Sequence, residues 1–202
     1  MKDKVKIDDR YLPSEELNHN KKPYEALSRV LSNTFEYTSL FDAGCRNGQL
    51  LFEVYNQDQS KVVRGCDYFQ WCLDAVDPLV SSMVYQWDLR DRIEESSYDI
   101  VTCFEVAEHI DKDYCDVFLE NLRLMTNKYM IITWSDSGGE TQRQFDPHLQ
   151  HLNPLKKDEV ISVVSKYFNL ETELSNKFLE SSNKESDFLW YWKKSLTVWS
   201  PK

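Results

Sequence analysis

The chain has few of the residues that mark several protein classes. Glycine (5) and proline (6) are scarce among its 202 residues, which excludes a low-complexity or collagen-like chain. No stretch approaches the roughly 18 consecutive apolar residues of a membrane span, and no apolar core follows the charged start 1–6, so we expect neither a span nor a signal peptide. Hydrophobic residues still make up 41%, which predicts one globular domain over 1–202 with a loosely ordered segment 1–22.

Metal-binding cysteine pairs and basic runs are also missing. None of the five cysteines forms a C-x-x-C pair, so no structural zinc site is expected. His148 and His151, three apart, could ligate a metal only with further ligands, so no metal-binding residue is assigned. The odd number of cysteines without a bridging pattern favours a reducing, cytoplasmic location. Acidic residues (34) outnumber basic ones (24), the formal charge is −10, and no Lys/Arg run exceeds two. Such a surface repels phosphate backbones, so a nucleic-acid partner is not expected.

Strand-like and helical patterns alternate along the chain, which favours an α/β fold with a parallel sheet covered on both faces. Helices are expected over Pro23–Phe35, from Gln49, around Cys115–Met125, and from Asn153-Pro154, where Asn would cap and Pro would open the helix. The expected strands are Leu40–Asp42, Val62–Asp67, Met83–Asp88, Tyr98–Glu105, Tyr129–Ser135, Leu170–Leu174 and Leu196–Trp199.

The most informative segment is Ser39–Leu50. A short apolar run ends at Asp42, a turn with Gly44 and Gly48 follows, and a helical pattern opens at Gln49. This strand, glycine turn and helix is the layout by which a Rossmann-like sheet holds a nucleotide. Arg46 stands where a further glycine would be expected.

Acidic residues end four of the expected strands: Asp42, Asp67, Asp88 and Glu105. In a parallel sheet these strand ends line the ligand crevice, and an acid near the position of Asp67 can accept hydrogen bonds from ribose hydroxyls. A single such acid could equally cap a helix or face water. Four at four strand ends favour a binding site.

Four segments in order resemble the class I S-adenosylmethionine-dependent methyltransferases, in particular small-molecule enzymes of the ubiquinone-biosynthesis type. They are Phe41–Gly48, Gly65–Asp67, Trp87–Leu89 and Tyr98–Ile110. The resemblance implies a seven-stranded, mostly parallel Rossmann-like sheet whose last strand is antiparallel, with S-adenosylmethionine as cofactor. It also implies the cofactor-binding residues Asp42, Ala43, Gly44, Gly48, Asp67, Tyr68, Asp88, Leu89, Phe104 and Glu105. Among these, the glycines would hold the methionine part, Asp67 the ribose and Asp88 the adenine amine.

Histidines supply the candidate catalytic bases. His109 follows the fourth strand, and His151 precedes the next helix, where the resemblance locates the acceptor; His148 is a weaker candidate. Each could take a proton from an acceptor hydroxyl, or simply order a loop through a hydrogen bond. The segment Ser135–Glu140 is expected to form either a mobile lid over the acceptor or a solvent-exposed connection. The aromatic run Phe188–Trp192 is expected either to pack in the core or to form a surface that binds the acceptor.

These features predict an S-adenosylmethionine-dependent methyltransferase that O-methylates a small molecule or a sugar unit with histidine-assisted deprotonation. The alternative is a cofactor-fold protein that has lost catalysis and serves interaction or regulation, a hypothesis that Arg46 in the glycine turn motivates. A nicotinamide-dependent enzyme would share the glycine turn, but the 105–110 segment argues against it. The oligomeric state is open.

Overall fold

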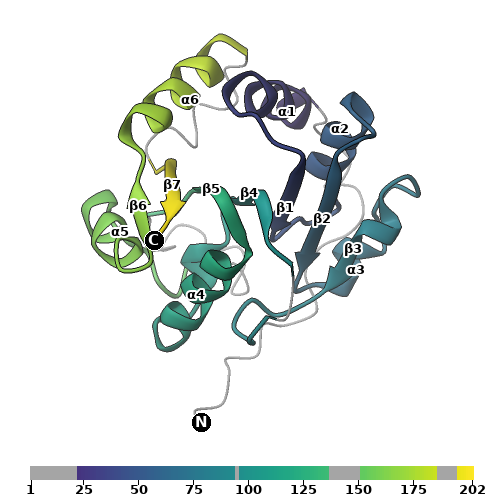
Figure 1. Ribbon diagram of the computed structural model, residues 1–202. Helices are drawn as coiled ribbons and strands as arrows, with labels where there is room; N and C mark the ends of the chain where they lie inside the picture. The colour runs from purple at the N-terminus through teal and green to yellow at the C-terminus, as the bar shows by residue number, and fades with distance from the viewer. Residues whose placement is uncertain (1–21, 94–95, 137–150, 186–194) are drawn as a thin grey trace.

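The computed structural model describes residues 22–93, 96–136, 151–185 and 195–202, and its centre is a seven-stranded sheet (Figure 1). The strand order is β3-β2-β1-β4-β5-β7-β6, and only β7 runs antiparallel to its neighbours. This confirms the expected Rossmann-like architecture. The strands are β1 Ser39–Ala43, β2 Val62–Asp67, β3 Val84–Gln86, β4 Tyr98–Cys103, β5 Thr126–Ile132, β6 Phe168–Leu170 and β7 Thr197–Pro201.

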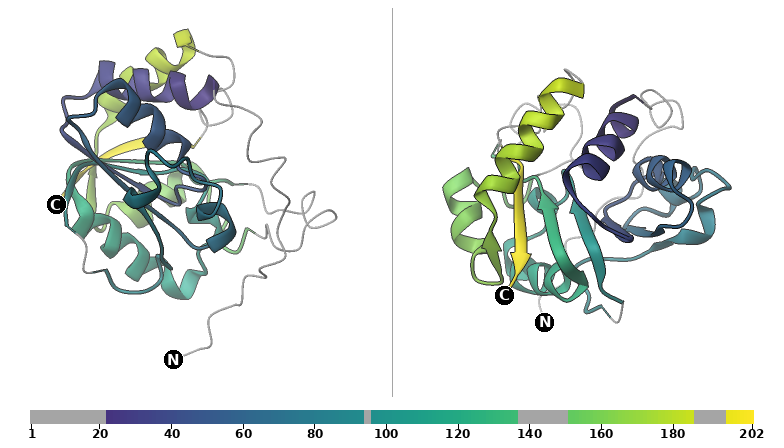
Figure 2. Two further views of the ribbon diagram at one scale, coloured as in Figure 1. Left: turned by 90° about the vertical axis from the view of Figure 1, so that its right-hand side faces the viewer. Right: turned by 45° about the horizontal axis from the view of Figure 1, so that its top comes forward.

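Helices cover both faces of the sheet, as the left view of Figure 2 shows. The longer helices are α1 Lys22–Thr34, α2 Gln49–Gln57, α4 Cys115–Met125, α5 Lys157–Val164 and α6 Thr172–Glu185; α3 Gln70–Leu73 and the 3₁₀ turns η2 Ser81–Met83, η3 Ala107–His109 and η4 Lys112–Tyr114 are short. No helix in these described ranges is long and apolar enough to cross a membrane.

Neighbouring residues of each central strand enter different cores. Leu40 and Ile100 pack with α1, α2 and α6, whereas Phe41 and Val101 pack with α4 and α5. Successive side chains of a strand point to opposite faces, so a strand covered on both sides must be apolar at consecutive positions. The continuous apolar runs in the sequence are the consequence.

Two expectations near the C-terminus were wrong. Of Leu170–Leu174, only Leu170 lies in a strand, because α6 begins at Thr172 and buries Phe178 near Phe35, with ring centroids 6.0 Å apart. Few apolar residues mark this helix, so its periodicity is weak. The preceding helix, α5, begins at Lys157 rather than at Pro154, and its first turn is closed by Glu159, which accepts a hydrogen bond from the Lys156 N–H at 2.9 Å.

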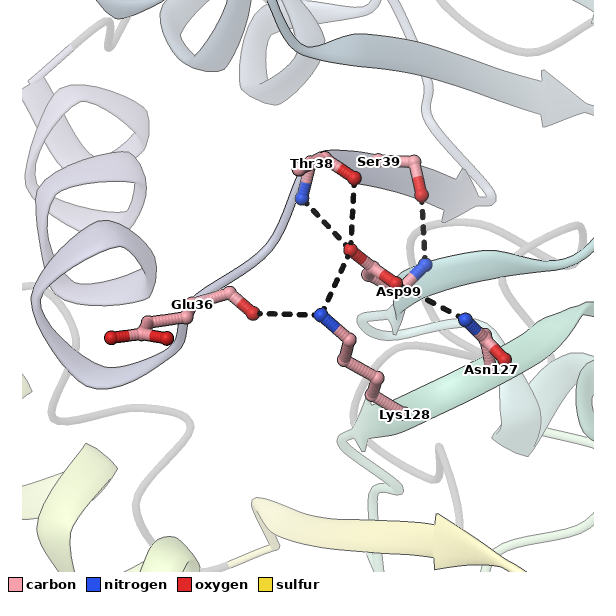
Figure 3. A network of polar contacts seen from close by, with 6 residues as sticks. All are labelled: Glu36, Thr38, Ser39, Asp99, Asn127 and Lys128. Carbon is pink, nitrogen blue, oxygen red and sulfur yellow. Dashed lines mark hydrogen bonds and ion pairs between the residues drawn. The ribbon is translucent and has the colours of Figure 1, made fainter.

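A buried carboxylate joins the chain before β1 to β4 and β5 at the end of the sheet where the parallel strands begin (Figure 3). Oδ2 of Asp99 accepts hydrogen bonds from the N–H and hydroxyl of Thr38, at 2.9 and 3.1 Å, and from Nζ of Lys128 at 3.1 Å. Asn127 donates to Oδ1 at 3.2 Å. These polar contacts lie opposite the candidate site, so we assign them to stability.

Candidate functional site

The turn between β1 and α2 contains three residues with left-handed backbone. Gly44 has φ +87° and Gly48 has φ +69°. A Cβ on Gly44 would lie 2.2 Å from Cγ2 of Val106, so the residue after Glu105 packs directly against the turn. The N–H groups of Gly44 and Cys45 both donate to the carbonyl of Cys66, at 2.9 and 2.8 Å, which fixes the turn to β2.

Arg46 also adopts a left-handed conformation, with φ 52°. It therefore uses the backbone geometry that a glycine would take at no steric cost. Its N–H donates to Oδ2 of Asp67 at 2.8 Å, and its side chain is exposed. Burial raises the pKa of Tyr24, and the Arg46 guanidinium near that hydroxyl opposes the shift, so the side chain extends toward α1.

Asp67 and Asp42 lie at the ends of adjacent parallel strands, as predicted. The oxygens of Asp67 accept the N–H groups of Arg46 and Phe69, at 2.8 and 2.9 Å, and burial raises its pKa. Asp42 is 6% exposed and accepts a hydrogen bond from the Thr102 hydroxyl at 2.7 Å. Burial, against the effect of that bond, raises the pKa of Asp42 to about 7.

Asp88 is engaged by a neighbour that sequence reasoning missed. Nε and Nη2 of Arg90 donate to its two oxygens, each at 2.9 Å, and the Arg90 N–H donates to Oδ1 at 2.9 Å. The guanidinium is 5.7 Å from the ring centroid of Tyr68 and 5.8 Å from that of Tyr114. This pair orients Asp88 rigidly, and its contact with an adenine amine stays a prediction.

The segment after β4 also contains a residue with left-handed backbone that is not glycine, as Arg46 is in the turn after β1. Glu105 has φ 55°, although it carries a side chain. Thr133 holds this conformation, because its hydroxyl accepts the Glu105 N–H at 2.8 Å and donates to Oε1 of the same residue at 2.9 Å. Strain of this kind persists where surrounding contacts impose it, and it is concentrated at functional sites.

The two predicted histidines lie together, although they are 42 positions apart in the chain. The ring centroids of His109 and His151 are 5.0 Å apart and the rings meet edge to face. Two hydrogen bonds hold the segment that follows His151. The Asn153 N–H donates to the carbonyl of Glu108 at 2.9 Å, and Nε1 of Trp134 donates to the carbonyl of Asn153 at 2.7 Å. Asn153 thus holds His151 beside η3 instead of capping a helix.

Glu108 completes this cluster and was not among the predicted residues. It is fully buried, and one ligand atom from each of Glu108, His109 and His151 lies within 4.8 Å of the others. Burial and the adjacent carboxylate of Glu105 raise the pKa of Glu108 to about 8, and burial raises that of Glu105. These three side chains are of types that ligate metals, whereas the sequence assigned no metal-binding residue. The sequence signal was two glutamates three apart with a histidine after the second.

The remaining predicted residues have different degrees of exposure. Ala43 and Leu89 are buried, and Tyr68 and Phe104 are partly exposed. The Leu89 carbonyl accepts a hydrogen bond from Nδ2 of Asn121 at 2.9 Å. His148, the glycines of Ser135–Glu140, the aromatic run Phe188–Trp192 and nearly all of segment 1–22 lie outside the described residues.

Solved structures share this architecture, whereas no protein-family model and no curated protein matches the chain. A TehB-like S-adenosylmethionine-dependent methyltransferase from Corynebacterium glutamicum is 15% identical, with TM-score 0.60 and 88% of each chain covered. The methyltransferase domain of bacterial CtHen1 is 19% identical, with TM-score 0.57 over 92% of this chain and 98% of that one. An O-methyltransferase family protein from Burkholderia thailandensis is 11% identical, with TM-score 0.58 over 89% and 54%.

The fold is that of the class I S-adenosylmethionine-dependent methyltransferases. At these identities the likeness concerns the fold alone, so cofactor and chemistry must be argued from the residues. The residues fit the cofactor that the fold implies. Asp67 is held by backbone donors and retains acceptor capacity for a ribose hydroxyl, because a carboxylate offers about four acceptor positions. The turn Gly44–Gly48 brings backbone close to the same strand ends.

Proposed function

We propose that this protein is an S-adenosylmethionine-dependent methyltransferase that methylates a hydroxyl of a small molecule or a sugar unit. The observation that carries the proposal is the pairing of the Gly44–Gly48 turn with Asp67, through the hydrogen bond from the Arg46 N–H. This bond joins the two parts of the expected cofactor site, because the turn would hold the methionine moiety and the carboxylate the ribose.

The cofactor supplies an electrophilic sulfonium methyl group when it is bound. The chain's part is to position the acceptor and to exclude water from the reacting atoms. Phe104 and Glu105, after β4, would flank the transferring methyl group. His109 follows them by five and four residues, and the Asn153 N–H, bound to the Glu108 carbonyl, holds His151 beside it. A hydroxyl is a weak nucleophile, so proton removal by these histidines would assist transfer.

An inactive interaction protein is the competing hypothesis, and it rested on Arg46. The structure gives that hypothesis no support at this residue, because Arg46 has a left-handed backbone and donates its N–H to Asp67, as a glycine could. A hydroxyl acceptor is supported by the polar side chains of Glu108, His109 and His151, and by the acidic composition of the chain, which disfavours polyanionic substrates.

Calorimetry with S-adenosylmethionine and S-adenosylhomocysteine tests the proposal. We expect the wild type to bind both, and Asp67→Asn to lose about 10- to 150-fold in affinity, equivalent to roughly 1.5–3 kcal/mol for hydrogen bonds to a charged group. Asp158→Asn, on the exposed start of α5, is the matched control and should bind as the wild type does. Absence of binding at millimolar cofactor would overturn the proposal.

Turnover is tested separately, by following S-adenosylhomocysteine release with hydroxyl-bearing acceptors such as catechols and simple glycosides. Replacement of both His109 and His151 by alanine should abolish the release that the wild type shows. Unchanged turnover in this double variant would remove the histidines from the mechanism and leave the cofactor site intact. A preference for amine acceptors would refute methylation at oxygen.

A further inference from the structure

The Glu108 carboxyl is the least satisfied polar group of the site. Its side chain is fully buried, and within the described ranges neither oxygen makes a hydrogen bond of normal geometry. Buried carboxyl groups are almost always paired, because losing water without a compensating partner is costly. Among the described residues no side chain compensates this carboxyl fully, so the group calls for a further partner.

Two imidazoles lie within reach of this carboxyl. His109 follows Glu108 in η3, and His151 is brought alongside by the Asn153 N–H, which binds the Glu108 carbonyl. Each of the three side chains offers one ligand atom, and these atoms lie within 4.8 Å of one another. Two segments distant in sequence thus converge on one small volume, with Glu105 adding a second carboxylate beside Glu108.

We propose that Glu108, His109 and His151 bind a divalent first-row transition cation. Two neutral imidazoles and one carboxylate form the ligand set of open, three-residue metal centres, in which the remaining positions are left for a substrate or water. Imidazole favours borderline cations over Mg²⁺, which prefers oxygen ligands in strict octahedral geometry. The site should therefore bind Mn²⁺ or Zn²⁺ more tightly than Mg²⁺.

The role of the cation rests on the proposed function. A cation here would bind the acceptor hydroxyl oxygen and lower its pKa, which replaces direct proton removal by the histidines. The O–H bond breaks and its proton passes to water. An oxygen electron pair forms the new C–O bond, and the C–S pair returns to the sulfur of the cofactor. The acceptor class is then a molecule with a hydroxyl able to coordinate a metal.

Titration of the metal-free full-length chain with Mn²⁺, followed by electron paramagnetic resonance and calorimetry, tests the site without any cofactor. We expect one Mn²⁺ site per chain. Glu108→Gln should lose more than about 100-fold in Mn²⁺ affinity, which is more than the loss caused by changing a residue that only supports a metal ligand. Glu120→Gln, on the exposed face of α4, is the matched control and should bind as the wild type does. Equal affinity in Glu108→Gln, or no binding of Mn²⁺ and Zn²⁺, would overturn the proposal.

Two readouts keep this result separate from folding and from cofactor binding. Metal-free Glu108→Gln should unfold at a temperature no lower than the wild type, because an amide replaces a buried carboxyl, while the rise in unfolding temperature caused by Mn²⁺ should be lost. A chelator should abolish wild-type turnover, while S-adenosylmethionine should still bind. Mn²⁺ binding without S-adenosylmethionine binding would refute the proposed function and preserve the metal site.

Discussion

The contact between Gly44 and Val106 makes the cofactor turn sensitive to one methyl group. Gly44→Ala would add a Cβ 2.2 Å from Cγ2 of Val106, where ordinary contacts begin at 3.4 Å. The residue would also have to keep φ +87°. The left-handed backbone costs about 1–2 kcal/mol for a residue with a Cβ, and the overlap costs about 1–3 kcal/mol more. We expect Gly44→Ala to lower the free energy of unfolding by about 2–5 kcal/mol.

A double-mutant cycle with Val106→Ala separates these two contributions. Val106→Ala removes the methyl group that would overlap with the new Cβ. The double variant should therefore lose about 1–3 kcal/mol less unfolding free energy than the two single variants lose together, because only the cost of the left-handed backbone at residue 44 remains from Gly44→Ala. Gly48→Ala is the matched control: its φ is +69°, yet its Cβ would lie 3.3 Å from Val76, so it should lose about 1–2 kcal/mol without coupling to Val106.

Urea unfolding of the four cycle members and the control, monitored by circular dichroism, gives these free energies. The reasoning would be refuted by a loss below about 1 kcal/mol for Gly44→Ala, or by additivity of Gly44→Ala with Val106→Ala. Cofactor affinity measured on the same proteins should follow the same order, because the turn that shifts is the turn proposed to hold the methionine moiety.

Three further changes test charge and strain at single residues. Hydrogen bonds from Thr38 and Lys128 outweigh the effect of burial and keep the pKa of Asp99 below its ordinary value, so its stabilisation is complete above pH about 4 and is lost as pH falls through the folded pKa. Asp99→Asn should therefore lower the free energy of unfolding, measured with urea, by about 2 kcal/mol at pH 7 and by less at pH 3; an equal loss at both pH values would contradict this. The pKa of Asp42 is raised to about 7, so the wild type should lose stability relative to Asp42→Asn as pH rises from 4 to 7, and a constant difference across that range would refute it. Arg46→Gly should be about 0.5–1 kcal/mol more stable than Arg46→Ala in the same assay, since only glycine is free of the left-handed penalty, and the reverse order would refute the strain.

The sheet was predictable because its strands carry strong local signals. β2 was predicted at its observed bounds, and β1 and β4 within a few residues. β1 and β4 are almost entirely buried, whereas β2 exposes Val62 and Arg64, and all three end at or near an acid. α6 was missed because its buried face is narrow and most of its residues are polar. A helix held by tertiary contacts such as Phe178 with Phe35 has little periodicity to detect.

The strand-end acids could be predicted from the sequence, but their partners could not. Asp67 was recognised by its position after a strand, whereas the Arg46 N–H that it accepts depends on a left-handed residue that no local pattern required. Likewise, His109 and His151 were named separately as bases. Their convergence on Glu108 depends on the Asn153 N–H, whose use in a tertiary contact also explains why Asn153 does not cap α5.

The two halves of the site meet in four consecutive residues, 105–108. Val106 packs on Gly44 of the cofactor turn, and its neighbour Glu105 is bound to Thr133 at the end of β5. Glu108, two residues after Val106, lies in the cluster with His109 and His151. A displacement of the turn by a cofactor would therefore move Val106, and with it the segment that carries Glu108. On this geometry, cofactor affinity and cation affinity should influence each other equally in both directions, as linkage between two sites requires.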